Sequence, residues 1–547
     1  MPQSYVARVD TVVKACPVKI CPPLRCPPPM DPRLLRVARD VDTAMWVALD
    51  SLAEADYLAG GGVLGAMVIR TRDSQLVWSR QPDTRMLPAS TQKLFSVGAA
   101  LSELGPGFRW RTTMWAQGRI QGRVLHGNLL LEGGGDPTLG GADGLGLTGI
   151  AYQLSKLGVQ EVRGNLVAID TLVGRGLEAW PQGWTINSAR DGYGAPVLGL
   201  NWAQNRIWDK SISEPRPEAL KALRKALAAR NISVTGTDTT VQVRGDSLSS
   251  RRDWSRVGSV ASPPLDEVAR ICLRESVNPY ADAMVLAMGM GKARVAPRDA
   301  GRKRMQEWAA RKGLEPWRMV LDDGSGLSRY DLVTARQMAK LLTADLRGPR
   351  GDRLVDFMAR GGEGTMRRRF KELPDPSRVT AKTGTLDGVA NLAGVLARPG
   401  RDTLAFAFLC SGYTGSARPV RKLQDRMIAL LAGVPLRPLV PSDTAADTVS
   451  VRDSVKADWV DSLKSKAPGR ADSANDTTKN VRPTESDTAK IRVSPPTSPI
   501  PSRSVPVPTG PLPSDLDSIR RHWSNLPKID SSAPMDTSRR PSRRPLD

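Results

Sequence analysis

Residues 87–95 read LPASTQKLF, and this stretch decides how the rest of the chain is interpreted. A proline and small residues lead into a predicted helix, with Ser90 near its start and Lys93 one turn further on. Serine is a favoured helix cap, so one interpretation is an ordinary helix N-terminus. The other is a nucleophile with its base, because positions i and i+3 lie on the same face of a helix. Partner motifs elsewhere in the chain must decide between the two.

The histidine count narrows the possible chemistry. The chain has 2 histidines, His126 and His522, and His522 lies in a segment that we predict to be disordered. A Ser-His-Asp triad or a histidine-based metal site would therefore rest on His126 alone. The spacing of the 5 cysteines is not that of a zinc site either (Cys16, Cys21, Cys26, Cys272, Cys410). We expect a catalytic base other than histidine, and no metal or other cofactor.

Two further short motifs bear on the interpretation of Ser90. Residues 276–278 read SVN and fall at the break between two predicted helices, whereas residues 382–384 read KTG and fall on a predicted strand. With Ser90 and Lys93 they complete the ordered three-motif set Ser-x-x-Lys, Ser-x-Asn, Lys-Thr-Gly. Each motif alone is weak, but their order and predicted contexts together favour catalysis.

The residue types suit acyl transfer by a serine. Ser90 at a helix N-terminus gains from the positive end of the helix dipole. Lys93 has too high a reference pKa for a base at neutral pH, but burial and a second ammonium on Lys382 would both lower it. Ser276 could then relay a proton to the leaving amine, and Asn278 could hold the substrate amide. We therefore predict a lysine-activated serine nucleophile.

The predicted strand that carries Lys382 suits substrate binding. Its edge can accept an extended peptide as an added strand. Gly384 is expected to leave room for that approach, while the hydroxyls of Thr383 and Thr385 are expected to hold a terminal carboxylate. The backbone N–H groups of Ser90 and Thr385 would form the oxyanion hole.

Hydrophobic periodicity divides the chain into four parts. We predict a proline-rich disordered lead over 1–45, a discontinuous catalytic domain over 46–105 and 261–435, inserted β-rich domains over 106–260, and a disordered tail over 436–547. Within the catalytic domain the pattern predicts a β-hairpin soon after Gly62, a helix opening at Ser90, an antiparallel three-strand meander after residue 378, and a closing helix after Pro419.

The charge balance predicts anionic partners. The formal net charge is +23 at pH 7. No zinc-finger spacing, RNA-binding signature or basic zipper is present, so nucleic acid is not an expected partner. Two explanations of the positive charge remain: an arginine-rich genome, and attraction to an acidic cell-wall polymer. No stretch reaches the roughly 18 apolar residues of a transmembrane helix, so none is expected.

With these motifs the chain resembles the penicillin-binding serine peptidases, and within them the multi-domain D-alanyl-D-alanine carboxypeptidase/endopeptidase family. The resemblance covers about residues 55–433, and the long interval between Ser90 and Ser276 matches the inserted domains of that family. Five local phrases also resemble it (residues 127–139, 193–205, 262–265, 322–331 and 363–370). It implies an α/β (α+β) fold of the β-lactamase/transpeptidase type: an antiparallel sheet flanked by helices, with a helical subdomain and β-rich insertions.

The resemblance also implies roles for residues of this chain. It makes Ser90 the acylated nucleophile and Lys93 the base, and it makes the later motif residues second-motif and substrate-binding groups (Ser276, Asn278, Lys382, Thr383, Thr385). Asp136 is implied to help recognise the diamino acid of the peptide; a turn residue before Pro137 is the alternative. Val277 stands where aspartate is more usual, at the tolerant middle position of the motif. The implied substrates are peptidoglycan peptides, and the implied covalent inhibitors are β-lactams.

Two other functions remain open. The chain could be a β-lactamase or esterase on the same scaffold, although it has no clear Glu-x-x-x-Asn loop and has a long insertion. It could also be a catalytically silent cell-wall-binding protein, although its motif set is complete. The resemblance implies a periplasmic or extracytoplasmic location, yet residues 1–45 lack the features of a signal peptide. Either the chain is cytoplasmic or its true start lies elsewhere, with Met30 and Met45 as candidates.

Overall fold

The computed structural model describes residues 43–54, 62–141, 146–170, 180–242, 254–290, 298–348 and 353–435. The predicted tail over 436–547 and residues 1–42 of the predicted lead lie outside them, together with His522 and the first three cysteines. The last residues assigned to that lead belong to a helix, α1 (Thr43–Ala53).

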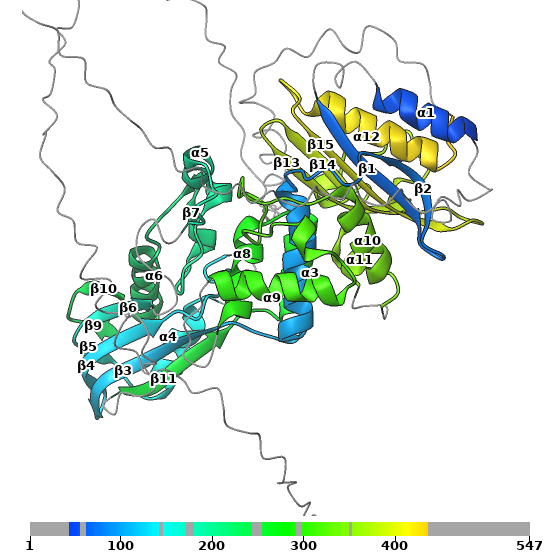
Figure 1. Cartoon of the computed structure of the whole chain (residues 1–547). Coiled ribbons are helices and arrows are strands. Elements are labelled where there is room, and N and C mark those ends of the chain that lie inside the picture. Colours follow the sequence, from blue (N-terminus) through cyan, green and yellow to red (C-terminus); the bar gives the residue numbers. More distant parts are fainter. Residues whose placement is uncertain are drawn as a thin grey trace, which may run out of the picture. The chain divides into compact units, whose positions relative to one another are not determined.

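A six-stranded antiparallel sheet joins the two ends of the described chain (Figure 1). Its order is β12-β13-β14-β15-β1-β2, and β1 pairs with β15 along its whole length. The predicted hairpin and the predicted meander are both confirmed in this sheet. The strands are β1 (Val63–Arg70), β2 (Gln75–Arg80), β12 (Ala359–Arg360), β13 (Val379–Leu386), β14 (Val389–Ala397) and β15 (Thr403–Ser411).

The two faces of this sheet are covered by different helices. Side chains alternate between faces along a strand, so Phe406 and Phe408 of β15 pack on one side, whereas Ala405 and Ala407 face the other. Helices α1 and α12 (Arg418–Leu431) cover the phenylalanine side (Figure 1). On the alanine side the small residues let α10 (Ala335–Asp345) pack against β15 and β1. The predicted closing helix is therefore confirmed as α12.

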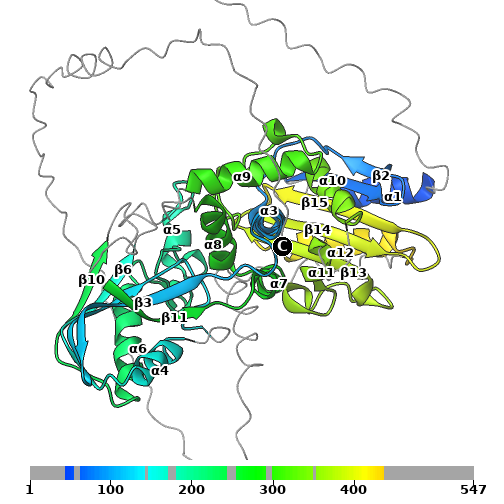
Figure 2. The same ribbon diagram turned by 90° about the horizontal axis from the view of Figure 1, so that it is seen from below.

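A group of helices adjoins the alanine side of the sheet. Helix α3 (Lys93–Leu104) is seen nearly end-on in Figure 2 and packs against α7 (Leu265–Glu275), α8 (Asn278–Gly289) and α9 (Arg298–Arg311). Every residue of α8 is buried, as expected of a helix whose apolar character runs all the way round. A short helix, α11 (Leu354–Phe357), completes the group. The N-terminus of α3 thus lies in the protein core.

The chain between α3 and α7 forms a second, seven-stranded sheet. Its antiparallel centre is extended by parallel pairs, and α4 (Thr148–Lys156) and α6 (Arg216–Ala228) pack on it. The strands are β3 (Arg111–Gln121), β4 (Val124–Glu132), β5 (Glu161–Arg163), β6 (Leu166–Asp170), β9 (Ser233–Val234), β10 (Asp238–Gln242) and β11 (Trp254–Ala261). Between β6 and α6 the chain makes a short excursion with α5 (Ile186–Arg190), β7 (Arg206–Ile207) and β8 (Lys210–Ser211).

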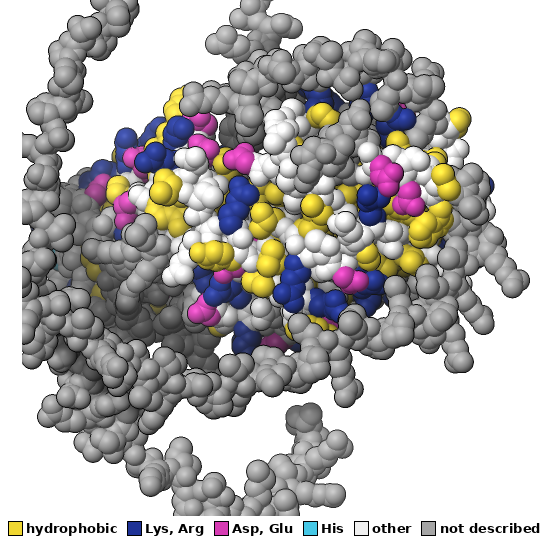
Figure 3. Space-filling model, turned by 45° about the horizontal axis from the view of Figure 1, so that its top comes forward, with side chains coloured by type: hydrophobic (Ala, Val, Ile, Leu, Met, Phe, Trp, Pro, Cys, Tyr) yellow, Lys and Arg dark blue, Asp and Glu magenta, His cyan; other side chains and the backbone are white. Residues whose placement is uncertain are grey.

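The described surface is mixed in charge. On the face drawn in Figure 3, Lys and Arg side chains are interspersed with acidic and apolar ones. Among the helices of the described ranges, none combines the length and the apolarity that crossing a membrane requires.

Candidate active site

Ser90 lies in a single 3-10 turn, Ala89–Gln92, that leads directly into α3. The backbone of this turn is strained. Ala89 has φ 46°, in the left-handed region that residues other than glycine rarely adopt, so contacts from the surrounding structure must hold the turn in this conformation. The N-cap residue is Pro88, and no side-chain capping bond is made. Instead, the Oγ of Ser90 lies 2.8 Å from the Nζ of Lys93. The helix-cap interpretation of Ser90 is therefore wrong, and the two side chains form a pair.

Lys93 is fully buried, and its Nζ has three oxygen neighbours. They are Ser90 Oγ at 2.8 Å, Asn278 Oδ1 at 2.5 Å and the Ser325 carbonyl at 2.7 Å. An amide oxygen and a carbonyl only accept hydrogen bonds, whereas a hydroxyl can also donate. A neutral amine that gives its two N–H groups to Asn278 and Ser325 therefore turns its lone pair toward Ser90. This arrangement aims a base at a nucleophile.

The electrostatics around Lys93 favour the neutral amine. Burial lowers the pKa of Lys93 below its usual value. Nearby acidic side chains oppose this effect but do not outweigh it (Asp282, Asp323, Asp331). His126, by contrast, is exposed on β4 in the second sheet. Lysine is thus the base that the described site offers to Ser90.

Three consecutive carbonyls of the loop 322–331 lie along the first turns of α3. Gln92, Ser96 and Lys93 donate to the carbonyls of residues 323, 324 and 325, at 3.2, 2.7 and 2.7 Å. The loop must approach closely, because a Cβ on Gly326 (φ 84°) would lie 1.8 Å from the carbonyl oxygen of Ala89. The backbone of this loop is thus held against the turn that carries Ser90.

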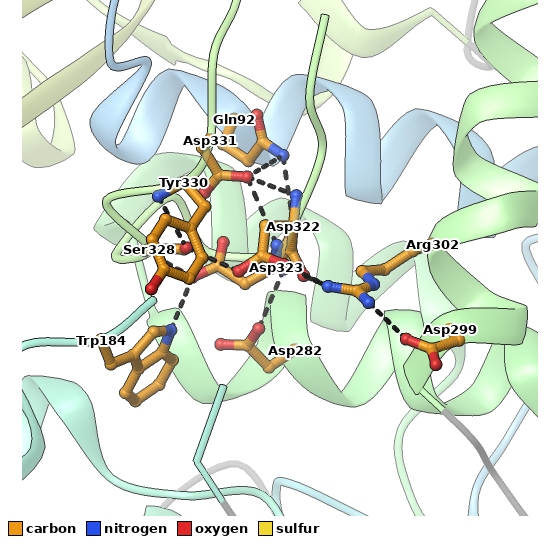
Figure 4. Close-up of polar contacts among 11 residues, drawn as sticks. Gln92, Trp184, Asp282, Asp299, Arg302, Asp322, Asp323, Ser328, Tyr330 and Asp331 are labelled. Carbon is orange, nitrogen blue, oxygen red and sulfur yellow. Dashed lines mark hydrogen bonds and ion pairs between the residues drawn. The ribbon is translucent and has the colours of Figure 1, made fainter. Parts of the chain in front are cut away.

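The carboxylate of Asp323 organises the same loop from within (Figure 4). Its Oδ1 accepts the N–H of Gly326 at 2.5 Å, and its Oδ2 accepts those of Leu327 and Ser328 at 3.0 and 2.9 Å. Trp184, from the excursion between β6 and α6, donates its indole N–H to Oδ2 at 2.7 Å. One buried carboxylate therefore fixes the turn that follows Ser325.

A second buried carboxyl group ties this loop to the nucleophile turn. Asp331 Oδ1 accepts from Gln92 Nε2 at 3.1 Å and from the backbone N–H of Asp322 at 2.6 Å (Figure 4). Burial and the neighbouring Asp323 carboxylate raise the pKa of Asp331 well above its usual value. Burial and Asp323 likewise raise the pKa of Asp282, to about 7. The acidic cluster thus bears less negative charge than its composition suggests.

The second motif lies at the predicted break between two helices, which confirms that part of the prediction. Ser276 ends α7 in the left-handed conformation (φ 62°), and Val277 caps the start of α8. Asn278 begins α8 and points its Oδ1 at Lys93, while its Nδ2 donates to the carbonyl of Tyr193 at 2.8 Å. The amide predicted to hold substrate therefore has two partners within the protein.

The third motif places a second buried lysine beside Ser276. Lys382 Nζ lies 2.9 Å from Ser276 Oγ and 2.8 Å from the Thr383 carbonyl. Burial, together with the neighbouring amino group of Lys93, holds the pKa of Lys382 well below its usual value. The structure therefore brings Ser90, Lys93, Ser276, Asn278 and Lys382 into one connected cluster.

The edge of β13 is only partly covered. Strand β12 pairs with Thr380 and Ala381 alone, so within the described residues the second half of β13 has no strand partner on that side. Thr383 donates to Thr365 at 3.0 Å, and Arg421 reaches the hydroxyl of Thr385 at 3.4 Å. The structure thus adds Thr365 and Arg421 to the predicted residues of this edge.

Gly384 lies close to the turn that carries Ser90, and the room that it leaves for a substrate peptide stays a prediction. A Cβ at this position would lie 2.8 Å from the Pro88 carbonyl oxygen and 3.1 Å from the backbone N of Ser90. The close approach that glycine permits is therefore that of the protein's own nucleophile turn. It also brings the backbone of β13 close to the backbone N of Ser90, and an oxyanion hole made of the N–H groups of Ser90 and Thr385 stays a prediction.

Asp136 lies in the loop that follows β4 and is buried. Its Oδ1 accepts from the backbone N–H and the hydroxyl of Thr138, at 2.8 and 2.7 Å, and burial raises its pKa. Its carbonyl accepts from Asn201 at 3.2 Å. These contacts are those of a turn residue, and a part for Asp136 in substrate recognition stays a prediction.

The whole of this site lies within a match to a family model. The D-Ala-D-Ala carboxypeptidase 3 (S13) family matches residues 47–210 and 208–434 of the chain. The chain belongs to this family. It is therefore a serine-type peptidase of the penicillin-binding class, as the motifs predict, and its mixed helices and sheets confirm the predicted α+β fold class.

Two relatives of known name align with this chain over most of their own length. A D-alanyl-D-alanine carboxypeptidase from Actinomadura sp. (strain R39) is 27% identical over 458 residues, covering 70% of this chain and 84% of the relative. The D-alanyl-D-alanine carboxypeptidase DacB of Haemophilus influenzae is 24% identical over 450 residues, covering 70% and 91%. The crystal structure of penicillin-binding protein 4 (dacB) from Haemophilus influenzae has the same fold, with a TM-score of 0.62, 21% identity, and 70% and 99% coverage.

Sequence reasoning did not assign the groups that hold Lys93 in place. The loop 322–331 stood out only as a phrase resembling the family, and Ser325 contributes a backbone carbonyl, which residue identity does not reveal. The signal for Asp323 was its place before Gly-Ser-Gly, since an aspartate there can accept several N–H groups of a turn. Nothing in the sequence connects Trp184 or Tyr193 with Lys93.

Proposed function

We propose that this S13 peptidase acts on the D-alanyl-D-alanine ends and crosslinks of peptidoglycan peptide stems through an acyl-enzyme on Ser90. The observation that carries the proposal is the environment of the Lys93 amine. Its Nζ lies 2.8 Å from Ser90 Oγ, and its other two partners, Asn278 Oδ1 and the Ser325 carbonyl, can only accept hydrogen bonds.

Acylation follows from this geometry. The neutral amine of Lys93 takes the hydroxyl proton of Ser90 as Oγ attacks the carbonyl carbon of the scissile D-alanyl bond. The negative charge that develops on the carbonyl oxygen is stabilised by the backbone N–H groups of Ser90 and Thr385. The C–N bond then breaks, which leaves the peptide esterified to Ser90.

The leaving amine needs a proton, and Ser276 is placed to pass it on. Its hydroxyl lies 2.9 Å from the Nζ of Lys382, inside the same cluster as the protonated Lys93. Ser276 gives its proton to the departing nitrogen and regains the proton that Lys93 took from Ser90, so Ser276 and Lys93 are both back in their starting protonation states at the end of the step. Water then attacks the ester with Lys93 again as base, and Ser90 is restored.

The β13 edge would bind the substrate. An extended peptide can pair with the uncovered second half of β13 as an added strand. A free terminal carboxylate then meets the hydroxyls of Thr383 and Thr385, with the guanidinium of Arg421 beside Thr385. Recognition of this carboxylate favours carboxypeptidase action, whereas endopeptidase action requires the edge to accept a longer chain.

Penicillins and other β-lactams would acylate Ser90 by the same route, because they present a strained amide and a carboxylate in a similar arrangement. A substrate in the cell wall implies a periplasmic or extracytoplasmic location. The net charge of +23 fits long-range attraction to acidic cell-wall polymers.

The proposal is tested by incubating the purified full-length chain with pentapeptide muropeptides and with crosslinked dimers, followed by mass spectrometry. We expect loss of the terminal D-alanine from the monomer, cleavage of the crosslink in the dimer, or both. In Ser90→Ala every such product should vanish. Ser102→Ala is the matched control, because Ser102 is exposed on the same helix.

Two outcomes would contradict the proposal. Equal product formation by Ser90→Ala and the unchanged chain would remove Ser90 as the nucleophile. Rapid, continuous turnover of nitrocefin without any action on muropeptides would instead identify a β-lactamase on this scaffold.

A further inference from the structure

The excursion that precedes β7 contacts one acceptor of Lys93, Asn278, directly and the other, the Ser325 carbonyl, through Asp323. The carbonyl of Tyr193 accepts from Asn278 Nδ2 at 2.8 Å. The indole of Trp184 donates to Asp323, whose carboxylate fixes the turn after Ser325. A segment far from Lys93 in sequence, residues 180–194, therefore supports the two groups that orient its amine.

The contact with Tyr193 determines which end of the Asn278 side-chain amide faces Lys93. A side-chain amide has one accepting and one donating end, and only the accepting end suits the N–H groups of Lys93. Because the Tyr193 carbonyl can only accept, it holds the donating end and turns Oδ1 toward Lys93. The backbone of the excursion thus removes the flipped orientation of Asn278.

At Ser325 the effect is transmitted through a turn. Asp323 binds the N–H groups of Gly326 and of residues 327–328, which hold the chain immediately after the Ser325 carbonyl. Trp184 is a donor to this carboxylate from outside the loop, and it comes from a different part of the fold (Figure 4). The excursion also packs tightly here: a Cβ on Gly183 would lie 1.9 Å from the hydroxyl of Ser328, and the Gly183 carbonyl accepts from the N–H of Arg329 at 2.8 Å.

We propose that Trp184 is a positioning residue for the catalytic base. Through Asp323 it fixes the Ser325 carbonyl, and through that carbonyl it fixes the direction in which the Lys93 amine presents its lone pair to Ser90. Residues 180–194 would then help to hold the catalytic base in position. Removing the indole N–H of Trp184 would slow proton transfer from Ser90 to Lys93. This inference rests on the proposed role of Lys93 as base.

The expected signature has two parts. A loosened carbonyl no longer orients the amine, so the maximal acylation rate falls. An acceptor stabilises an ammonium more than a neutral amine, so loosening it also lowers the pKa of Lys93 and moves the acidic limb of the pH profile to lower pH. The substitution acts directly on Asp323, which loses one donor, whereas the other ionisable groups that act on Lys93 or lie beside it keep their own hydrogen-bond partners (Cys272, Asp282, Asp331, Lys382).

The experiment compares Trp184→Phe with Trp78→Phe in the full chain. Trp78 also donates its indole N–H to an aspartate, Asp50, at 3.0 Å, but it lies in the core between the six-stranded sheet and α1. Acylation by a fluorescent penicillin is timed from pH 5 to pH 10, alongside thermal unfolding. We expect Trp184→Phe to reduce the plateau rate about tenfold and to shift the acidic limb downward, with Trp78→Phe retaining the wild-type profile.

A second variant separates positioning from folding. Trp184→His keeps a planar ring with an N–H donor, so it should recover part of the lost plateau even if both variants unfold at a lower temperature. An unchanged profile in Trp184→Phe, or equal losses in Trp184→Phe and Trp78→Phe, would overturn the inference. Failure of the wild-type chain to react with penicillin would instead overturn the proposed function. This outcome is distinguishable because it is measured on the wild-type protein and does not depend on either variant.

Discussion

The two ends of the candidate site are built in opposite ways. The partners of Lys93 come from the turn that carries Ser90, from the start of α8 and from the loop 322–331, and Asn278 and Ser325 are buried. At the β13 edge Thr385 is exposed, and its neighbour there is the guanidinium of Arg421. One end is fixed by long-range backbone contacts, and the other is open to solvent.

This difference indicates where the chain can tolerate change. Buried polar groups depend on each partner, because a lost partner leaves a desolvated group unsatisfied. Charged contacts at an exposed edge are screened by water and salt, so each contributes little to stability or to binding. Changes around Lys93 should therefore be severe, whereas changes at the β13 edge should be graded.

The largest effect is expected from Lys93→Met, which keeps the length of the side chain and removes the base. Acylation by a fluorescent penicillin should fall about 10³-fold, since a general base contributes on the order of 10²–10⁴. The fold should survive, because the substitution also removes a buried amine. The exposed Lys371→Met serves as the control. A loss of less than about tenfold would show that Lys93 is not the base.

The pH dependence of the unchanged chain should follow the ionisation of Lys93. Acylation needs the neutral amine, so on the acidic side the rate should rise about tenfold per pH unit until the folded-state pKa is passed. That pKa lies below the usual 10.5 because of burial. Between these two values the unfolded chain binds more protons, so the free energy of unfolding should also increase with pH. An acylation rate that is constant from pH 5 to pH 10 would contradict this account.

Gly384→Ala tests the contact between the two ends. The added Cβ would lie 2.8 Å from the Pro88 carbonyl oxygen, so the nucleophile turn must shift. We expect a loss of about 1–3 kcal/mol in the free energy of unfolding and acylation slowed about tenfold. Gly107→Ala is the matched control, because a Cβ there meets nothing within 4 Å. Denaturant unfolding and penicillin labelling are measured for both variants. Equal stability and equal labelling rates in Gly384→Ala and Gly107→Ala would refute the close contact between Gly384 and the turn that carries Ser90.

The smallest effect is expected from Arg421→Gln at the open edge. Release of D-alanine from a peptide with a free carboxyl terminus should fall about two- to fivefold, because an exposed charge adds little and is screened by salt. The same peptide with an amidated terminus should show no difference between the two proteins. If the loss is as large with the amidated peptide, Arg421 does not act on the carboxylate.

Local patterns in the sequence were sufficient for much of the fold. The β1–β2 hairpin, the β13–β15 meander and the break at Ser276 follow from alternation, turn residues and helix ends, all of which act over a few residues. The three motifs could be recognised in the sequence for the same reason, because each is short and lies in a secondary-structure element that local patterns predict.

The support of the base could not be predicted in this way. Ser325 acts through a carbonyl that every residue has, and Trp184 acts on Asp323 across a long interval of chain. At Gly384 the sequence indicates that something approaches closely, but only the packing of β13 on the nucleophile turn shows what it is. These features depend on tertiary contacts, which leave no periodic trace in the sequence.

The central claim is that Ser90 is the residue acylated. The direct measurement is peptide mapping of the penicillin-treated full chain by mass spectrometry after trypsin digestion, which releases residues 86–93 as one peptide. The account predicts a penicilloyl adduct on this peptide, located at Ser90 by fragmentation and absent from Ser90→Ala. An adduct on a different peptide, or an unmodified 86–93 peptide from fully inhibited protein, would contradict it.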